Sequence, residues 1–428
     1  MSSLVVRPGG PFNAAIRVPG DKSISHRALV MSAIADGKCE IQGLLEGEDC
    51  LNTARCLRAL GVHCDRLAEG HWIVHGNGLG GLRRSSQPLD VGNAGTALSL
   101  LTGLLAAHPF ESVVTGDESI GRRPQQRLAE PLGLLGASVT GIGERCLPPL
   151  TIRGARLSPI RYQCPQPSAQ VKSAVILAAL HTEGTTVFAE PAHTRDHTER
   201  MLRLFGVSVE VTGLQVAVRG PAPLKATSLT VPGDLSSAAF LLVAAAIIPG
   251  SRVTVPDVGI NPTRTGILDL LHAMGASVTI ENTRQVLSEP VADVTVEGLE
   301  CLRGAEIAGD LVPRMIDEIP IACVAACFAQ GETVVRDAPQ LRHKESDRIG
   351  AIASQLGRLG ADITPTADGL MVRGIGRLHG GVCESLGDHR IAMSCAVAGL
   401  AAGEPVEVRD PECISTSFPG FAEILASL

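Results

Sequence analysis

The sequence predicts an α/β protein of two domains with three repeated units in each, and three observations support this. Six Ala-rich apolar segments recur, each entered by polar residues, and their successive starts lie 68 to 81 residues apart. A second pattern, an amphipathic segment that ends at a glycine and runs into a strand, alternates with them. The tetrapeptide Val-Pro-Gly-Asp occurs twice, at Val18 and at Val231. A recurring period indicates units that bury their apolar faces by associating with one another.

The composition is that of a globular, cytoplasmic protein. The 428 residues are 45% hydrophobic and 19% charged, which excludes a disordered chain. The longest apolar stretch, residues 238–248, has the length of a core helix, and the first residues lack the apolar region of a signal peptide. A net charge of −7 argues against general nucleic-acid binding. We therefore expect neither nucleic acid nor a membrane as a partner.

No metal and no cofactor are expected. The twelve cysteines include no Cys-x-x-Cys pair, and several, such as Cys323 and Cys327, lie in apolar runs typical of reduced core residues. His193, His197 and Glu199 have a spacing that could suit a metal, but no third ligand is evident. A solvated helix start is the preferred interpretation of that segment.

Each unit is expected to pair a buried helix with an outer helix. The buried helices are apolar on all sides and cover residues 23–35, 95–107, 168–180, 236–248, 317–329 and 389–401. The outer helices are amphipathic, and five of them end at a glycine suited to a left-handed C-cap. These glycines are Gly61, Gly136, Gly206, Gly275 and Gly360, and a sixth copy of the segment begins at Phe421.

The two Val-Pro-Gly-Asp sequences predict the domain boundary. We interpret them as two crossings of the chain, with hinges near residues 19–21 and 232–234. Residues 20–233 would then form one domain, and residues 1–19 with 234–428 the other.

Polar residues gather where the helices begin, and this predicts an anion site. Ser23 is the expected N-cap of the first buried helix, and Arg27 lies on the same side, one turn later. Helix starts carry partial positive charge, and arginines there add bidentate donors for phosphate or carboxylate. The residues concerned are Lys22, Ser23, Arg27, Gly95, Arg123, Ser168, Gln170, Arg195, Lys344, Arg348 and Arg390.

Three acids, Asp317, Glu345 and Asp347, lie among these cations. They could be structural counter-ions, or a general base and a general acid whose ionisation the cations tune. The residues alone do not decide between these two interpretations.

Eight motifs in order resemble the EPSP synthase/enolpyruvyl transferase family, over nearly the whole chain. They are D-K-S-I-S-H-R-A, G-N-A-G-T-A, R-R-P, S-A-Q-V-K-S-A, T-R-D-H-T-E, M-I-D-E-I-P, K-E-S-D-R and D-H-R-I-A-M-S. The resemblance implies a two-domain inverse α/β barrel of six βαβαββ-type units. It also implies transfer of the enolpyruvyl group of phosphoenolpyruvate to the 5-hydroxyl of shikimate 3-phosphate, and we expect a monomer.

The resemblance also implies the roles of the residues. Asp317 would take the hydroxyl proton, Glu345 would protonate the methylene carbon, and Lys22 would assist as a third catalytic group. Shikimate 3-phosphate would be bound by Lys22, Ser23, Arg27, Ser168, Ala169, Gln170, Arg195, Asp317 and Lys344. Phosphoenolpyruvate would be bound by Lys22, Gly95, Arg123, Gln170, Arg348 and Arg390.

The chain departs from the better-studied branch of the family at three places. Ser417 precedes Phe-Pro where that branch has Lys, Arg195 lies near the position of a Tyr, and S-A-Q replaces S-S-Q. These departures resemble the glyphosate-tolerant branch, whereas Gly95 leaves room beside phosphoenolpyruvate.

Two other functions fit the sequence less well. The sister enzyme acting on UDP-N-acetylglucosamine places a reactive Cys in the loop that here reads G-D-E-S-I-G-R-R-P, and no Cys lies between Cys64 and Cys146. A phosphate-ligand-binding or RNA-end-processing protein on a related fold is disfavoured by the net charge and by the acids Asp317 and Glu345.

Overall fold

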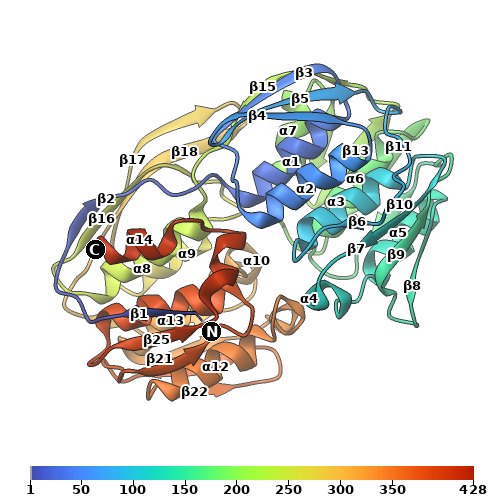
Figure 1. Cartoon of the computed structure of the whole chain (residues 1–428). Coiled ribbons are helices and arrows are strands. Elements are labelled where there is room, and N and C mark those ends of the chain that lie inside the picture. The colour runs from blue at the N-terminus through green and yellow to red at the C-terminus, as the bar shows by residue number, and fades with distance from the viewer. Residues whose placement is uncertain (1) are drawn as a thin grey trace. The chain divides into compact units, whose positions relative to one another are not determined.

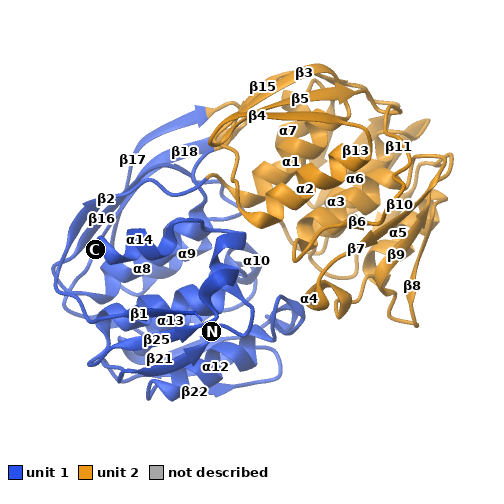
Figure 2. Cartoon of the chain, viewed as in Figure 1, with its two compact units in different colours: residues 1–19, 232–285, 290–428 blue, residues 20–231, 286–289 orange. Residues whose placement is uncertain are grey.

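The computed structural model describes residues 2–428 of the chain (Figure 1). They divide into two compact units, shown in separate colours in Figure 2. Unit 2 comprises residues 20–231 and 286–289, and unit 1 comprises residues 1–19, 232–285 and 290–428. Each unit has its own hydrophobic core. The four residues 286–289 form a hairpin tip assigned to unit 2, a feature that the sequence did not reveal.

Unit 2 contains three small sheets with one plan, in which an edge strand joins in parallel and the other strands are antiparallel. The first sheet has β3 (Ala35–Gln42), β4 (His63–Ala68), β5 (His71–Asn77), β14 (Leu224–Lys225) and β15 (Ser228–Thr230). The second has β6 (Leu89–Asp90), β7 (Glu111–Thr115), β8 (Ser138–Ile142) and β9 (Leu147–Arg153). The third has β10 (Arg161–Gln163), β11 (Gly184–Ala189), β12 (Val209–Thr212) and β13 (Gln215–Gly220).

Unit 1 repeats the plan, and its N-terminal strands take part in two of its three sheets. The first sheet has β2 (Asn13–Ala15), β16 (Arg252–Gly259), β17 (Ser277–Val286) and β18 (Glu289–Glu297). The second has β19 (Leu302–Arg303), β20 (Glu306–Ile307), β21 (Ala329–Val335), β22 (Asp362–Pro365) and β23 (Leu370–Gly374). The third has β1 (Ser3–Val6), β24 (Gly381–Glu384) and β25 (Val406–Arg409).

The six buried helices are confirmed, and each begins and ends within two residues of its predicted bounds. They are α1 (Lys22–Ala33), α3 (Gly95–Leu105), α6 (Ala169–Ala179), α8 (Leu235–Ile247), α11 (Ile319–Cys327) and α13 (His389–Ala401). Every residue of α8 is buried, as its lack of a polar face requires. Within each unit these helices pack on one another.

The outer helices and short turns complete the units. The outer helices are α2 (Glu48–Ala59), α5 (Gln126–Leu135), α7 (His197–Leu204), α9 (Gly266–Ala273), α12 (Arg348–Arg358) and α14 (Phe421–Ala426). The shorter elements are α4 (Glu118–Gly121), α10 (Leu311–Met315) and the 3₁₀ turns η1 (Pro339–His343) and η2 (Pro411–Thr416). None of the described helices has the length and apolarity needed to cross a membrane.

The glycine caps are confirmed by backbone angles. After α2, α5, α7, α9 and α12 the glycine has φ of 87°, 117°, 84°, 90° and 85° in turn. A residue with a side chain rarely adopts this left-handed backbone conformation. Glycine therefore ends the helix, and β-branched residues then begin a strand.

The assignment of Ser23 as an N-cap is wrong. The cap of α1 is Asp21, whose carboxylate accepts the backbone N–H of Ile24 at 2.9 Å. Asp234 and Asp388 cap α8 and α13 in the same way. Asp is as good a cap as Ser, and the first helical turn begins directly after it, which places Ser23 inside the helix.

Candidate functional site

The site residues of unit 2 begin with Lys22, the first residue of α1. Its Nζ donates to Asp49 Oδ2 at 3.0 Å, from a position in which only 15% of the lysine side chain is exposed. Asp49 lies in the first turn of α2 and is buried. Asp49 could not be identified from the sequence, because its contact with Lys22 joins two helices of one unit at no recognisable spacing.

Arg27 is buried and held by three helices. Its Nη1 donates to the backbone oxygen of Ser23 at 3.0 Å, its Nε to Thr198 Oγ1 of α7 at 2.8 Å, and its Nη2 to Ser173 Oγ of α6 at 2.7 Å. Ser173 Oγ also donates to the Ala169 oxygen at 2.7 Å, so Thr198 must donate to Ser173 across their 2.7 Å contact. This fixed arrangement leaves two of the five guanidinium N–H groups, one on each terminal nitrogen, for a ligand.

Burial and its neighbours set the protonation of Arg27. Burial lowers the pKa of Arg27 to about 10, with Glu199 raising it and Arg195 lowering it. The guanidinium therefore still carries its charge at neutral pH, and the charge is poorly solvated. A buried cation of this kind favours an anionic ligand.

Side-chain donors gather beside Gly95 at the start of α3, in a region that we call the anion space. A Cβ built on Gly95 would lie 2.8 Å from Arg123 Nη1 and 3.5 Å from Gln170 Nε2. Arg123 is itself held by Ser119 Oγ at 2.9 Å and Asn93 Oδ1 at 3.4 Å. The first turn of α3 has no side-chain cap, which leaves its partial positive charge directed at the same space.

The remaining predicted residues of unit 2 lie at the starts of α6 and α7. Ser168 caps α6 by accepting the Val171 N–H at 3.3 Å, and Ala169 is the first helical residue. Arg195 precedes Asp196, the N-cap residue of α7, and is half-buried. Unit 2 thus brings together the helix starts that the sequence identified.

In unit 1, Arg348 is surrounded by three carboxylates. Its Nε donates to Asp388 Oδ2 at 2.9 Å, its Nη1 to Asp317 Oδ1 at 3.1 Å and its Nη2 to Glu345 Oε2 at 2.6 Å. Burial alone would lower the pKa of Arg348, but Asp388, Glu345 and Asp317 outweigh burial and raise it above its ordinary value. The sequence identified Asp317 and Glu345 but gave no role to Asp388.

The three acids play different parts. Asp317 lies in the turn between α10 and α11 and also accepts Lys344 Nζ at 3.3 Å. Asp347 caps α12 through the Gly350 N–H and pairs with Arg342 at 2.6 Å. Asp347 is therefore a structural counter-ion, whereas Asp317 and Glu345 both meet the cations expected to bind substrate.

Arg390 contrasts with Arg348. Within residues 2–428 its guanidinium makes no hydrogen bond, and its ion pair with Glu318 Oε1 is long, at 3.7 Å. Glu318 is buried and accepts a hydrogen bond from Ser236. Arg390 therefore retains its donors for an anion, while those of Arg348 are occupied by carboxylates.

The expectation of a solvated helix start at His197 and Glu199 is wrong. His197 Nδ1 lies 2.8 Å from Glu289 Oε1, and both side chains are buried. Glu199 pairs at 2.8 Å with Lys172, which also contacts Glu190 at 3.0 Å. His197 and Glu199 are therefore buried, because Glu289 of the hairpin tip and Lys172 of α6 contact them.

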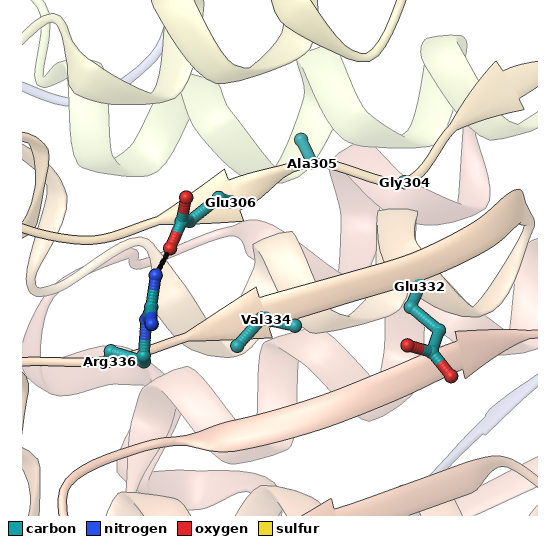
Figure 3. A pocket seen from close by; sticks show the side chains of 6 residues that line it. All are labelled: Gly304, Ala305, Glu306, Glu332, Val334 and Arg336. Atoms are coloured by element: carbon teal, nitrogen blue, oxygen red, sulfur yellow. Dashed lines mark ion pairs between the residues drawn. The ribbon is translucent and has the colours of Figure 1, made fainter.

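A surface hollow of about 450 Å³ lies on unit 1 over β20 and β21 (Figure 3). Its lining is Gly304, Ala305, Glu306, Glu332, Val334 and Arg336. Its charges are satisfied in pairs, Glu306 by Arg336 and Glu332 by Arg373. The hollow contains none of the predicted site residues, and we assign no function to it.

Comparison with known proteins identifies the family. Residues 6–425 match the model of EPSP synthase (3-phosphoshikimate 1-carboxyvinyltransferase). A relative of that name from Desulforamulus reducens is 49% identical over 99% of this chain and 98% of its own, and one from Pelotomaculum thermopropionicum is 52% identical over 97% and 96%.

Solved structures agree with the sequence comparison. EPSP synthase from Acinetobacter baumannii superposes with a TM-score of 0.87 at 45% identity, covering 100% of this chain and 98% of that one. The enolpyruvyl transferase NikO from Streptomyces tendae has a TM-score of 0.80 at 21% identity, which shows the shared fold alone. The fold is the two-domain inverse α/β barrel, and the chain belongs to the EPSP synthase (3-phosphoshikimate 1-carboxyvinyltransferase) family.

Proposed function

We propose that the residue sets of the two units act together on shikimate 3-phosphate and phosphoenolpyruvate. The family reaction transfers the enolpyruvyl group to the 5-hydroxyl of shikimate 3-phosphate and releases phosphate. It is a step of the shikimate pathway, which leads to chorismate and the aromatic amino acids. One observation carries the proposal. Among the clustered cations, the buried guanidinium of Arg348 donates hydrogen bonds to both acids, Asp317 and Glu345.

Unit 2 supplies most of the site for shikimate 3-phosphate. Arg27 presents two N–H groups from a rigid arrangement, which suits a carboxylate or a phosphate. The starts of α1 and α6 add Lys22, Ser23, Ser168, Ala169 and Gln170, and Arg195 adds a further cation. Lys344 and Asp317 of unit 1 complete the set of contacts to this substrate.

Phosphoenolpyruvate takes the anion space beside Gly95. Arg123 and Gln170 direct donors at that space, Lys22 lies at the start of the neighbouring helix, and unit 1 contributes Arg390 and Arg348. Fixed cations that are already oriented stabilise charge without reorganisation when the reaction occurs.

Asp317 accepts the proton of the 5-hydroxyl as the new C–O bond forms, and Glu345 donates a proton to the methylene carbon. The resulting tetrahedral intermediate then loses phosphate together with a proton from its new methyl group, which restores the carbon–carbon double bond. An ion pair with Arg348 stabilises the ionised form of Glu345, whereas a general acid has to be protonated. Arg348 therefore exchanges Glu345 for the anionic groups of phosphoenolpyruvate before the proton is transferred.

We also propose that units 2 and 1 are the two enolpyruvyl-transferase domains, hinged near residues 19–21 and 232–234, and that they close on the substrates. A single chain supplies every residue of the proposed site, which supports a monomer. The twelve cysteines are free thiols in the structure, which supports a reducing compartment such as the cytoplasm.

The experiment is an assay of phosphate release with each substrate alone and with both. Release should require both, and Lys22→Met and Asp317→Ala should each lower kcat by more than about tenfold, a loss of more than about 1.4 kcal/mol in transition-state stabilisation. Release without shikimate 3-phosphate, or variants within about tenfold of the parent, would refute the proposal.

A further inference from the structure

Arg127 is exposed in the first turn of α5, and within residues 2–428 its side chain makes one hydrogen bond. Its Nη2 donates to Oε1 of Gln170, the second residue of α6, at 2.8 Å. Neither the repeat pattern nor the motifs gave Arg127 a role. It nevertheless contacts a side chain that borders the anion space beside Gly95.

The contact fixes which way the amide of Gln170 points. A guanidinium has donors and no acceptor, so Gln170 has to present its oxygen to Arg127. The amide nitrogen then points away from Arg127, and it lies 3.5 Å from the position of a Cβ on Gly95, where Arg123 Nη1 lies at 2.8 Å. Both nitrogens therefore lie beside Gly95, where each can donate to one anion.

We infer that Arg127 is a positioning residue that sets the polarity of the Gln170 amide. With Arg127 in place, the amide offers an N–H to an anion beside Gly95. Without it, the amide is free to turn over and to offer an oxygen, which would repel the anion and forfeit a hydrogen bond to a charged group. The inference rests on the proposed role of Gln170 in binding phosphoenolpyruvate.

The test is a series of substitutions with graded hydrogen-bonding polarity. Arg127→Met has neither a donor nor a cation and should raise KM for phosphoenolpyruvate about tenfold, the loss of about one hydrogen bond to a charged group. Arg127→Lys keeps a donor and should stay within about threefold of the parent. Arg127→Glu offers only acceptors, favours the inverted amide, and should do at least as much harm as Arg127→Met. KM for shikimate 3-phosphate should change less than KM for phosphoenolpyruvate.

A neighbouring arginine provides the matched control for loss of charge. Arg122 lies in the same segment, is exposed, and pairs with Glu118. Arg122→Met should leave KM for phosphoenolpyruvate within about twofold of the parent, because an exposed, screened charge contributes little. An equal effect of Arg122→Met and Arg127→Met would show that charge alone matters and would overturn the inference.

A double-substitution cycle separates positioning from direct binding. If Arg127 acts through Gln170, adding Arg127→Met to the Gln170→Ala variant should raise KM for phosphoenolpyruvate by less than about a further twofold. If it adds its full effect, Arg127 acts on the ligand by itself and the inference is wrong. Gln170→Ala without effect on KM would refute the proposed role of Gln170 and the inference with it. A harmful Gln170→Ala beside a harmless Arg127→Met would refute the inference and leave the proposed function intact.

Discussion

Arg348 and Arg390 are both predicted to bind phosphoenolpyruvate, but they differ in how many of their hydrogen-bond donors are already used. Arg348 is enclosed by Asp317, Glu345 and Asp388, whereas the guanidinium of Arg390 makes no hydrogen bond within the described chain. A buried arginine with satisfied donors costs the fold little, while one with open donors gains most from an arriving anion. Arg390 is therefore the expected first contact in unit 1, and Arg348 follows by exchange.

Two hydroxyl groups, those of Thr198 and Ser173, hold the guanidinium of Arg27 in place. Thr198→Val removes the acceptor of Arg27 Nε and the donor to Ser173 while keeping the shape of the side chain. We expect KM for shikimate 3-phosphate to rise about tenfold, because the guanidinium loses the bond that fixes its plane. KM for phosphoenolpyruvate should change less than about threefold, since its proposed contacts are elsewhere.

Thr198→Ser is the matched control, because it retains the hydroxyl, and it should stay within about threefold of the parent. Steady-state kinetics with each substrate varied in turn provides the measurement. Equal changes in both KM values would mean that Thr198 supports the fold in general and not Arg27 in particular.

Two glycines in helices of unit 2 have opposite surroundings. Gly103 of α3 faces α6 so closely that a Cβ would lie 2.3 Å from the Ala174 oxygen. Gly133 of α5 is exposed, and a Cβ there would meet nothing within 4 Å. Both residues are helical, so the same substitution tests packing at one position and helix propensity at the other.

Gly103→Ala should destabilise the protein by about 1 to 3 kcal/mol, because it forces α3 and α6 apart. Gly133→Ala should stabilise it by about 0.5 to 1 kcal/mol, because alanine restricts the unfolded chain and suits a helix. Thermal unfolding of the two variants beside the parent provides the comparison. A Gly103→Ala protein as stable as the parent would contradict the close approach of these helices.

The elements that could be predicted are those specified by local pattern. The six apolar helices and the five glycine ends follow from periodicity, since burial on all sides and a left-handed cap each leave a signature in sequence. The contacts of Asp49 and Asp388 could not be predicted, because each carboxylate meets its cation across two elements whose separation in sequence has no fixed value. The hairpin tip at residues 286–289 was missed for the same reason. Asp21 was missed because two good capping residues stand two positions apart.

Folding of the whole molecule should depend on pH through a buried histidine in α1. Burial, together with Lys22 and Arg27, lowers the pKa of His26 to about 3. The unfolded chain protonates this imidazole near its ordinary value of 6.5, so between these pH values the unfolded state binds the extra proton. The contribution of neutral His26 to the free energy of unfolding is complete above about pH 6.5. It falls as the pH decreases, by at most about 1.4 kcal/mol per pH unit.

His26→Gln removes the titration and can keep a hydrogen bond to Thr53, which lies 2.8 Å from His26 Nδ1. We expect the unfolding temperature of this variant to drop less than that of the parent between pH 7 and pH 5. Identical pH dependence in the two proteins would show that His26 is not the group responsible.

At the scale of the whole molecule, we propose that residues of both units bind the same two anions. The proposed binding contacts are divided between unit 2, with Lys22, Arg27 and Arg123, and unit 1, with Asp317 and Arg390. Substrates that contact both sets should therefore stabilise a closed form.

Small-angle scattering tests this claim most directly, with shikimate 3-phosphate present alone and together with an unreactive anionic analogue of phosphoenolpyruvate. We expect the radius of gyration to decrease when both are present, and to decrease less in the Arg390→Ala variant. A radius of gyration that does not change when both ligands bind would contradict it.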